Sequence, residues 1–280
     1  MSPVMNKVIL VTGVSSGFGK ATAQLLAETG HNVYGTVRNE PCGPQNISIL
    51  KMDLKDQESI KQAVQTIVQK EGRIDILINN AGMHIGGPFE TTPLSDIKLL
   101  TDTNISGTIT LTREVLPIMR EQGGGKIFNI SSIGGLMGLP YQAYYSAGKF
   151  AIEGFSEALR MEVKPFNIDV ILINPGDFCT NNTANRRKYL APMEPDDPYF
   201  EQYRKSLDII EKDERKGWDP SVLAKKICRI IEKGKSHQRY IIAPFGQKLA
   251  VILRYLLPGK IFIKIIENHY GIKTLQNRKK

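Results

Sequence analysis

The chain alternates short apolar runs with longer segments in which apolar residues recur every three to four positions. The short runs are rich in β-branched residues and predict buried strands at 7–11, 32–37, 47–52, 75–78, 126–131 and 167–173. The three-to-four spacing predicts helices at 21–29, 56–70, 93–119 and 144–163. Strands that alternate with helices are joined by crossovers, which place neighbouring strands parallel. We therefore expect an α/β fold, with a Rossmann-type, doubly wound parallel sheet that carries helices on both faces.

The alternation of predicted strands and helices stops after residue 176. Residues 177 to about 217 hold a polar, proline-rich stretch followed by a charged helical segment at 199–213. An insertion of this size at the carboxyl end of a strand is usually functional, so we interpret it as a lid over the substrate. A further helix at 220–233 and a last strand at 239–242 then return to the earlier pattern.

The tail from residue 247 has another pattern, in which aliphatic residues interleave with basic ones and Pro258 divides the stretch into two short helices. The basic residues of this pattern are Lys248, Arg254, Lys260 and Lys264. A basic amphipathic element is typical of a membrane-surface contact or of an interface between subunits. The alternative is that its apolar side packs on the substrate edge of its own domain. We therefore divide the chain into one catalytic domain, residues 1–245, and a C-terminal amphipathic extension, residues 246–280.

Composition agrees with a globular protein, because 280 residues with 41% apolar and 23% charged side chains build one large core. The formal net charge is +9, and much of the excess lies in the last part of the chain. Such a charge attracts an anionic partner, for example a phosphorylated cofactor or a membrane surface, or it is a solvated basic surface. The tail carries no nucleic-acid motif, so we expect no nucleic-acid partner.

Cysteine and histidine usage argues against a metal centre. The three cysteines are odd in number and scattered, and neither they nor the four histidines have metal-ligand spacing. We expect reduced thiols and a cytoplasmic protein, with peripheral membrane contact through the tail as an addition. The apolar run near the N-terminus is too short for a signal peptide, and no run approaches the ~20 apolar residues of a membrane span.

A glycine-rich turn from Thr12 to Gly19 lies between the first predicted strand and the first predicted helix, with the spacing Gly-x-x-x-Gly-x-Gly. Glycines let the backbone approach a pyrophosphate, and the N-terminus of the following helix supplies amide donors and the positive end of its dipole. A glycine-rich turn alone is a weak signal. Between a strand and a helix near the start of the chain, it predicts a dinucleotide site.

Arg38 ends the second predicted strand, at the position that selects between the two nicotinamide dinucleotides. An acidic residue there accepts hydrogen bonds from the adenosine ribose of NAD, whereas an arginine suits the 2′-phosphate of NADP. We therefore prefer NADP(H), with NAD(H) as the alternative because Glu40 lies close by. The other interpretation of Arg38 is an ordinary surface arginine.

Tyr145 and Lys149 are four residues apart in a predicted helix and therefore share one face about one turn apart. A neighbouring ammonium lowers a phenol pKa from its usual ~10, which makes the hydroxyl a usable acid near neutral pH. Ser132 follows a predicted strand, and its hydroxyl can point to the same place. Tyr–Lys pairs are common in helices, but the nearby Tyr141 and Tyr144 do not precede a lysine by four. The three side chains predict a proton-donating site for a carbonyl oxygen.

Small and polar residues gather where the predicted strands end, the edge at which open α/β sheets bind ligands. They are Gly13, Arg38, Asp53, Asn80, Ser132 and Pro175. Asp53 suits the adenine amino group, although a helix cap or a turn explains it equally well. Asn80 is also a common turn residue. Asn104 lies within a predicted helix, where asparagine is unfavourable, and we interpret it as a polar relay or a kink.

Together these motifs resemble the short-chain dehydrogenase/reductase family over at least residues 6–180. The matching motifs are Thr12-Gly13-x-x-x-Gly17-x-Gly19, Asp53-Leu54, Asn79-Asn80-Ala81-Gly82, Asn104, Ser132, Tyr145-x-x-x-Lys149 and Pro175-Gly176. Residues 132–140 are similar to the 17β-hydroxysteroid dehydrogenase and retinol dehydrogenase branch. One departure is Phe18, which stands where a smaller aliphatic residue is more usual.

The resemblance implies a catalytic tetrad. Tyr145 is then the general acid in reduction, and Lys149 binds the nicotinamide ribose and lowers the pKa of Tyr145. Ser132 polarises the carbonyl, and Asn104 fixes a water that joins Lys149 to solvent. The implied cofactor site is lined by Gly13, Ser15, Ser16, Gly17, Phe18, Gly19, Arg38, Asp53, Leu54, Asn80, Ala81, Gly82, Tyr145, Lys149, Pro175, Gly176 and Thr180.

From the resemblance we expect an NADP(H)-dependent oxidoreductase that interconverts a ketone and a secondary alcohol, or an aldehyde and a primary alcohol. Its substrate is then a hydrophobic small molecule such as a steroid or retinoid, and the protein is a homo-oligomer. The alternative within enzymes is a 3-oxoacyl thioester reductase. The alternative outside enzymes is an NADP(H)-sensing binding protein, although family members of that kind typically lose the Tyr or the Lys.

Overall fold

The computed structural model describes residues 6–39, 46–179, 193–234 and 236–273. Seven parallel strands form one sheet in the order β3-β2-β1-β4-β5-β6-β7. They are β1 (Val8–Thr12), β2 (Asn32–Val37), β3 (Ser48–Lys51), β4 (Ile76–Asn79), β5 (Gly125–Ile130), β6 (Ile168–Pro175) and β7 (Arg239–Ile242). The strand order reverses between β1 and β4, which is where doubly wound sheets bind their ligands. The predicted Rossmann-type fold is confirmed.

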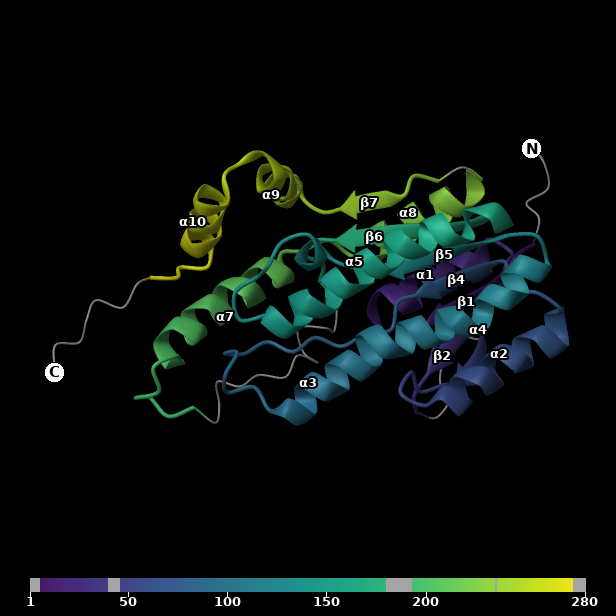
Figure 1. The fold of residues 1–280 in the computed structure, drawn as a ribbon, viewed down its shortest axis with the longest axis horizontal. Helices are drawn as coiled ribbons and strands as arrows, with labels where there is room; N and C mark the ends of the chain where they lie inside the picture. The colour runs from purple at the N-terminus through teal and green to yellow at the C-terminus, as the bar shows by residue number, and fades with distance from the viewer. Residues whose placement is uncertain (1–5, 40–45, 180–192, 235, 274–280) are drawn as a thin grey trace.

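Helices cover both faces of the sheet (Figure 1). On one face lie α1 (Gly17–Glu28) and α8 (Pro220–Glu232), and on the other lie α2 (Gln57–Glu71), α4 (Gly107–Glu121) and α5 (Ala143–Val163). Successive residues of β1 therefore belong to opposite cores: Ile9 packs with the first group of helices and Leu10 with the second. Because side chains of a strand alternate between faces, a strand that is buried on both reads as an unbroken apolar run.

The predicted helix at 93–119 is divided by a π-helical turn. The helix α3 (Leu94–Thr101) runs into the turn Asp102–Ser106, and α4 continues from Gly107. The apolar spacing does not reveal this change, because one wider turn hardly disturbs a three-to-four pattern. The first helix also begins at Gly17 rather than at residue 21, so that it opens inside the glycine-rich turn.

Three helices gather beyond the carboxyl ends of β6 and β7, at one end of the molecule (Figure 1). They are α7 (Phe200–Arg215), α9 (Phe245–Leu256) and α10 (Gly259–His269). Val251 of α9 and Phe262 of α10 pack with Met137 in an apolar cluster separate from the two main cores. The tail therefore packs one side on its own domain, as one of the two interpretations expected. Within the described residues, no helix has the length and apolar character that crossing a membrane requires.

Candidate active site

The glycine-rich turn forms a cradle that side chains would fill. Gly13 has φ +71°, a left-handed conformation that favours glycine. At Gly19 a Cβ atom would lie 2.2 Å from the carbonyl oxygen of Gly13, which no other residue permits. Ser16 is extended where α1 begins, and its side chain caps none of the first amide groups of the helix. The turn therefore fits an anionic pyrophosphate, because backbone and amide donors stay accessible to it.

Asn80 and Thr12 join the end of β4 to this turn. The Asn80 side-chain nitrogen donates to the carbonyl oxygens of Thr12 at 2.8 Å and Gly13 at 3.2 Å. The Thr12 hydroxyl accepts from the backbone nitrogens of Asn80 at 2.9 Å and Ala81 at 2.8 Å. These bonds fix the two strand ends at the reversal of the sheet, so the turn residue Asn80 has a structural use here.

A crevice extends from the glycine-rich turn to α5. The residues that line it and that the sequence predicted for the cofactor are Gly13, Ser15, Ser16, Gly17, Phe18, Arg38, Asp53, Leu54, Asn80, Ala81, Gly82, Tyr145 and Lys149. Gly19 lies behind the turn, against Gly13. Pro175 and Gly176 line the neighbouring cavity instead. Thr180 lies outside the described residues.

Arg38 and Asp53 line the crevice just after β2 and β3, whereas Lys149 lines it from α5. Arg38 is exposed after the end of β2, where its guanidinium is open to an anionic group. Asp53 accepts a hydrogen bond from the backbone nitrogen of Lys55 at 3.0 Å. Asp56 rather than Asp53 caps α2, by accepting from the amides of Glu58 and Ser59. Asp53 is thus a turn residue whose carboxylate also borders the crevice.

Tyr145, Lys149 and Ser132 meet where β5 ends and α5 begins. The Lys149 Nζ donates to the carbonyl oxygen of Ile130 at 2.8 Å and lies 5.8 Å from the centre of the Tyr145 ring. The Ser132 hydroxyl accepts from the Gly134 amide at 3.0 Å, which fixes its direction. Lys149 lines the crevice, Ser132 lines the neighbouring cavity, and Tyr145 lines both.

Burial lowers the pKa of Lys149 to about 8, and the carboxylate of Glu153 opposes this shift. Glu153 is four residues further along α5 and is itself buried. Near neutral pH the ammonium is therefore still charged, but it loses its proton at a lower pH than an exposed lysine does. The positive charge beside Tyr145 thus depends on pH within the physiological range.

His84 stacks on the ring of Tyr145, with ring centres 4.0 Å apart and planes 20° from parallel. It is buried and lines both the crevice and the cavity. An aromatic ring held parallel to the phenol restricts the rotation of Tyr145. His84 lies just beyond the Asn79–Gly82 motif, and sequence reasoning assigned no role to it.

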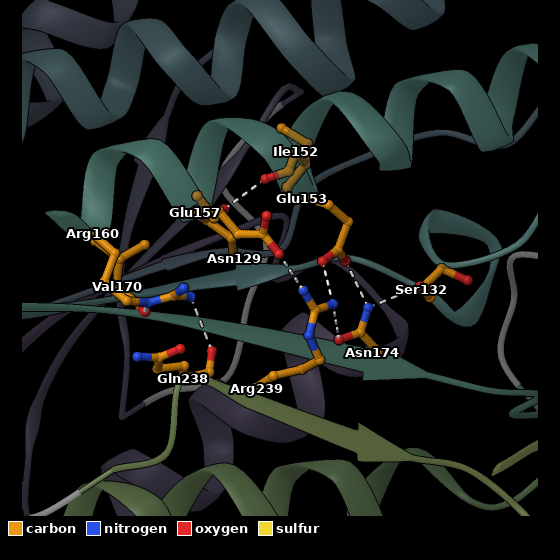
Figure 2. Close-up of polar contacts among 11 residues, drawn as sticks. Asn129, Ser132, Ile152, Glu153, Glu157, Arg160, Val170, Asn174, Gln238 and Arg239 are labelled. Atoms are coloured by element: carbon orange, nitrogen blue, oxygen red, sulfur yellow. Dashed lines mark hydrogen bonds and ion pairs between the residues drawn. The ribbon is translucent and has the colours of Figure 1, made fainter. Parts of the chain in front are cut away.

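A buried polar network supports the loop of Ser132 from behind (Figure 2). The Asn174 side-chain nitrogen donates to the Ser132 carbonyl oxygen at 2.9 Å and to Glu153 Oε1 at 2.6 Å. Arg239 of β7 pairs with Glu153 and, at 2.9 Å, with the more exposed Glu157. The guanidinium thus joins β7 to α5, and Asn174 of β6 carries the connection to the backbone of Ser132.

Asn104 occupies the π-helical turn, and its side chain makes two hydrogen bonds to the backbone of Met83. Its Oδ1 accepts from the Met83 amide and its Nδ2 donates to the Met83 carbonyl oxygen, both at 2.8 Å. The amide therefore holds the segment that leads to His84. A water bound at Asn104 and connected to Lys149 stays a prediction.

An apolar cavity of about 620 Å³ adjoins the crevice at Tyr145. Its walls come from the segment after β5, the end of β6, and the helices α7, α9 and α10. Among its apolar side chains are Ile133, Met137, Leu139, Phe178, Leu253 and Phe262. Its ionisable lining residues are Asp177, Asp213, Glu214, Lys216, Tyr145, Tyr270 and the histidines His84 and His269, the second of which contacts Asp213. A cavity of this volume accepts a drug-sized apolar molecule.

Gln247 of α9 ties the tail helices to this cavity. Its Oε1 accepts from the backbone nitrogen of Asp177 at 3.0 Å, and its Nε2 donates to the Asp177 carboxylate. A Cβ on Gly176 would lie 1.9 Å from the Gln247 oxygen, so glycine at this position permits the contact. The predicted lid lies partly outside the described residues, but α7 does border the cavity through Ile210 and Asp213.

Comparison with known proteins gives a consistent result. Residues 7–191 match the family model described as short chain dehydrogenase. A 3-ketodihydrosphingosine reductase from Bacteroides thetaiotaomicron is 44% identical over 267 residues, which cover 95% of this chain and 99% of the relative. Estradiol 17-beta-dehydrogenase 1 from Rattus norvegicus is 36% identical over 189 residues, which cover 62% of this chain and 54% of the relative.

Among solved structures, a short-chain dehydrogenase from Streptomyces avermitilis matches with a TM-score of 0.77 and 30% sequence identity. The match covers 99% of this chain and 100% of that chain. It therefore includes the helices that follow the sheet as well as the cofactor-binding half.

Proposed function

The chain belongs to the short-chain dehydrogenase family of oxidoreductases, and we propose that it reduces a long-chain amino ketone of the 3-ketodihydrosphingosine type with NADPH. The observation that carries this proposal is the position of Tyr145. Its side chain borders both the nucleotide-shaped crevice and the apolar cavity. A group that donates a proton to a carbonyl must reach both the substrate and the reducing end of the cofactor.

The crevice fits a nicotinamide dinucleotide because its glycine cradle leaves room for a pyrophosphate beside the N-terminus of α1. When bound, the nicotinamide supplies the hydride. The exposed guanidinium of Arg38 at the end of β2 favours a cofactor with a 2′-phosphate, so we propose NADP(H). Asp53, which also lines the crevice, suits the adenine amino group.

The chain's own residues hold the carbonyl and move one proton. The Tyr145 hydroxyl gives its proton to the carbonyl oxygen as the carbonyl carbon is reduced, which yields the alcohol. Ser132 hydrogen-bonds the same oxygen and opposes charge build-up there. The Lys149 ammonium stabilises the phenolate that remains on Tyr145, and its fixed bond to the Ile130 carbonyl keeps it in place. Asn104 supports this site through the Met83 backbone.

The cavity supports a substrate that is both apolar and cationic. Its apolar walls suit an alkyl chain, and Asp177 lies directly after the Pro175-Gly176 end of β6, close to the reacting edge. An amino ketone carries an ammonium on the carbon beside its carbonyl, and a carboxylate near the carbonyl pairs with that charge. The first of the relatives named above acts, by its name, on such an amino ketone.

A neutral steroid ketone is the second candidate. The apolar lining favours it, and a relative named for estradiol is 36% identical over 62% of this chain. A steroid has no ammonium, so it gains nothing from Asp177. The two candidates therefore differ in their dependence on one carboxylate.

The test is a panel of 3-ketodihydrosphingosine, a steroid ketone, retinal and a 3-oxoacyl thioester, followed by loss of NADPH absorbance. We expect the amino ketone to have the highest kcat/KM. Tyr145→Phe should lose turnover by about a hundredfold or more while it retains NADPH binding. If the wild type binds NADPH but reduces no ketone, the protein is instead a cofactor-sensing module. If Tyr145→Phe keeps full turnover, the proton comes from another group.

A further inference from the structure

The two C-terminal helices expose an unusual concentration of large apolar side chains. Half of the large apolar residues that are exposed in the described part of the chain fall within residues 245–265. They are Phe245, Leu249, Ile252, Tyr255, Leu256, Ile261, Ile263 and Ile265. Phe245 is 80% exposed and Leu256 is 72% exposed, so these are not side chains at the edge of a core. Scattered exposed apolar residues are normal, but a contiguous group marks an interaction surface.

The exposed residues of α9 form one stripe. Phe245, Leu249, Ile252 and Leu256 follow the spacing i, i+4, i+7 and i+11, which keeps them on a single side of a helix. The opposite side carries Val251, which is buried against the domain. Thus α9 is apolar on two sides, and the domain covers only one of them.

Along α9 and the first two turns of α10, the chain itself carries charge of a single sign. Between residues 245 and 266 the chain has no acidic residue and four basic ones, Lys248, Arg254, Lys260 and Lys264. All four are exposed, and Arg254 lies over the ring of Phe262, which holds α9 and α10 together. A surface that combines exposed aliphatic side chains with unopposed positive charge is complementary to an anionic lipid leaflet.

The cavity opens onto the same surface. Leu249 and Ile265 are each 40% exposed, and both also line the substrate cavity. The helices α9 and α10 therefore place apolar side chains both on their exposed surface and in the wall of the cavity that reaches Tyr145.

We propose that the exposed apolar side of α9 and α10 docks on an anionic phospholipid bilayer and opens the substrate cavity toward it. Docking follows from the exposed stripe and the charge alone. The passage of a long-chain substrate from the bilayer into the cavity rests, in addition, on the proposed function. A second copy of this chain is the alternative partner for this surface, but the lysines of the two copies would repel each other there.

The first experiment is flotation of the full chain with vesicles of phosphatidylcholine, with or without an equal share of phosphatidylglycerol. We expect binding to the anionic vesicles and at least tenfold weaker binding to the zwitterionic ones. Ile252→Glu combined with Leu256→Glu should weaken binding on the order of a hundredfold, because two apolar anchors become anions. Leu94→Glu is the matched control, since Leu94 is 81% exposed but lies in α3, and it should bind like the wild type.

A second pair of variants tests the charge. Replacing Lys248, Lys260 and Lys264 by glutamine should weaken binding to anionic vesicles about a hundredfold. The same change at the exposed Lys61, Lys70 and Lys225 should leave binding within about threefold of the wild type. Equal loss in both triple variants would show that net charge, and not this surface, attracts the vesicles, and would overturn the proposal.

Measuring turnover of a soluble and of a vesicle-embedded substrate distinguishes a failure of membrane docking from a failure of the proposed ketone reduction. Ile252 and Leu256 do not line the cavity, so the double variant should reduce a water-soluble, short-chain amino ketone at the wild-type rate. Its turnover of the long-chain substrate embedded in anionic vesicles should fall about tenfold or more. If wild type binds vesicles but reduces no ketone, only the proposed function is wrong. If wild type does not bind vesicles, or a dimer that the double variant disrupts forms instead, docking is wrong.

Discussion

Two neighbouring regions of this molecule depart from the usual partition of polar and apolar residues in opposite directions. Around β7, the charges of Arg239 and Glu153 are drawn inside, where each has its partner. Directly after β7, the helices α9 and α10 leave large aliphatic side chains outside. Burying a charge and exposing an apolar face both oppose folding. A contribution to folding stability therefore explains neither the buried charges nor the exposed apolar side chains. The contacts that each region makes explain them better.

The buried region contacts the segment that holds Ser132. Arg239 and Glu153 are connected through Asn174 to the carbonyl oxygen of Ser132, so the charges hold the segment that faces the substrate cavity. The exposed region contacts the same cavity from the other side, through Leu249 and Ile265. One region thus supports the wall of the cavity at Ser132, and the other contributes the wall formed by α9 and α10.

The largest effect is expected from removing the buried carboxylate. Glu153→Gln should lower the free energy of unfolding by about 3 kcal/mol, because Arg239 then keeps its charge without its most buried partner. Glu157→Gln is the control, since Glu157 is 57% exposed against 7% for Glu153, and should change stability by less than about 1 kcal/mol. Urea denaturation measures both. Equal losses would mean that burial does not distinguish the two pairs.

A somewhat smaller effect concerns the charge of Lys149. Burial lowers its pKa to about 8 in the folded chain, against the ordinary value of 10.5, so between these pH values the unfolded state binds more protons. Stability contributed by this group therefore rises with pH across that window and is lowest below pH 8. At pH 7, Lys149→Met should gain about 2 kcal/mol in free energy of unfolding yet lose turnover.

The difference between this variant and the wild type should shrink as the pH rises from about 8 to 10.5. Tyr34 and Tyr141 have pKa values raised to about 12 and oppose this trend at high pH, but they act equally in both proteins. Thermal unfolding in matched buffers gives the comparison. A difference that stays constant with pH would mean that the pKa of Lys149 is the same in the folded and the unfolded chain, so that burial does not lower it.

The third prediction concerns the cofactor crevice, which belongs to neither region. Arg38→Asp should weaken NADPH binding about tenfold more than NADH binding, because only NADPH presents a 2′-phosphate to this position. Titration of cofactor fluorescence gives both dissociation constants. The same loss for the two cofactors would remove the basis for preferring NADP(H).

The smallest expected effect is on the stability of the exposed helices. Ile252→Glu should change the free energy of unfolding by no more than about 0.5 kcal/mol, because Ile252 is already half exposed. Val251→Glu, one residue earlier, should cost several times more, since Val251 packs in the cluster with Phe262. Urea denaturation of the two variants tests which side of α9 the domain covers. If Ile252→Glu also unfolds the protein, the proposed docking surface is part of the core.

Much of the fold could be predicted because its signals are local. Apolar runs with β-branched residues gave the strands, and the four-residue spacing of Tyr145 and Lys149 put both on one side of α5. The glycine-rich turn was visible for the same reason, since strand, turn and helix follow one another directly. These patterns need no knowledge of which distant segments meet.

What escaped prediction depends on distant segments. Arg239 and Glu153 are 86 residues apart, and no periodicity indicates that they pair. The stacking of His84 on Tyr145 likewise depends on where two loops meet in space. The one available signal was a charged residue on an otherwise buried side of a helix, as at Glu153. The sequence indicated an amphipathic tail, but it did not indicate which side of α9 the domain covers, because α9 is apolar on two sides.

The π-helical turn at Asp102–Ser106 has a consequence for insertions and deletions in this protein. A wider turn carries extra backbone relative to a regular helix, so deleting one residue there would let the segment wind continuously. Each α-helical residue contributes a rotation of about 100° and a rise of 1.5 Å, so the deletion would swing Leu94–Thr101 around its axis. That one extra residue therefore sets the rotation of α3 relative to α4. It also sets the position from which Asn104 makes its hydrogen bonds to Met83.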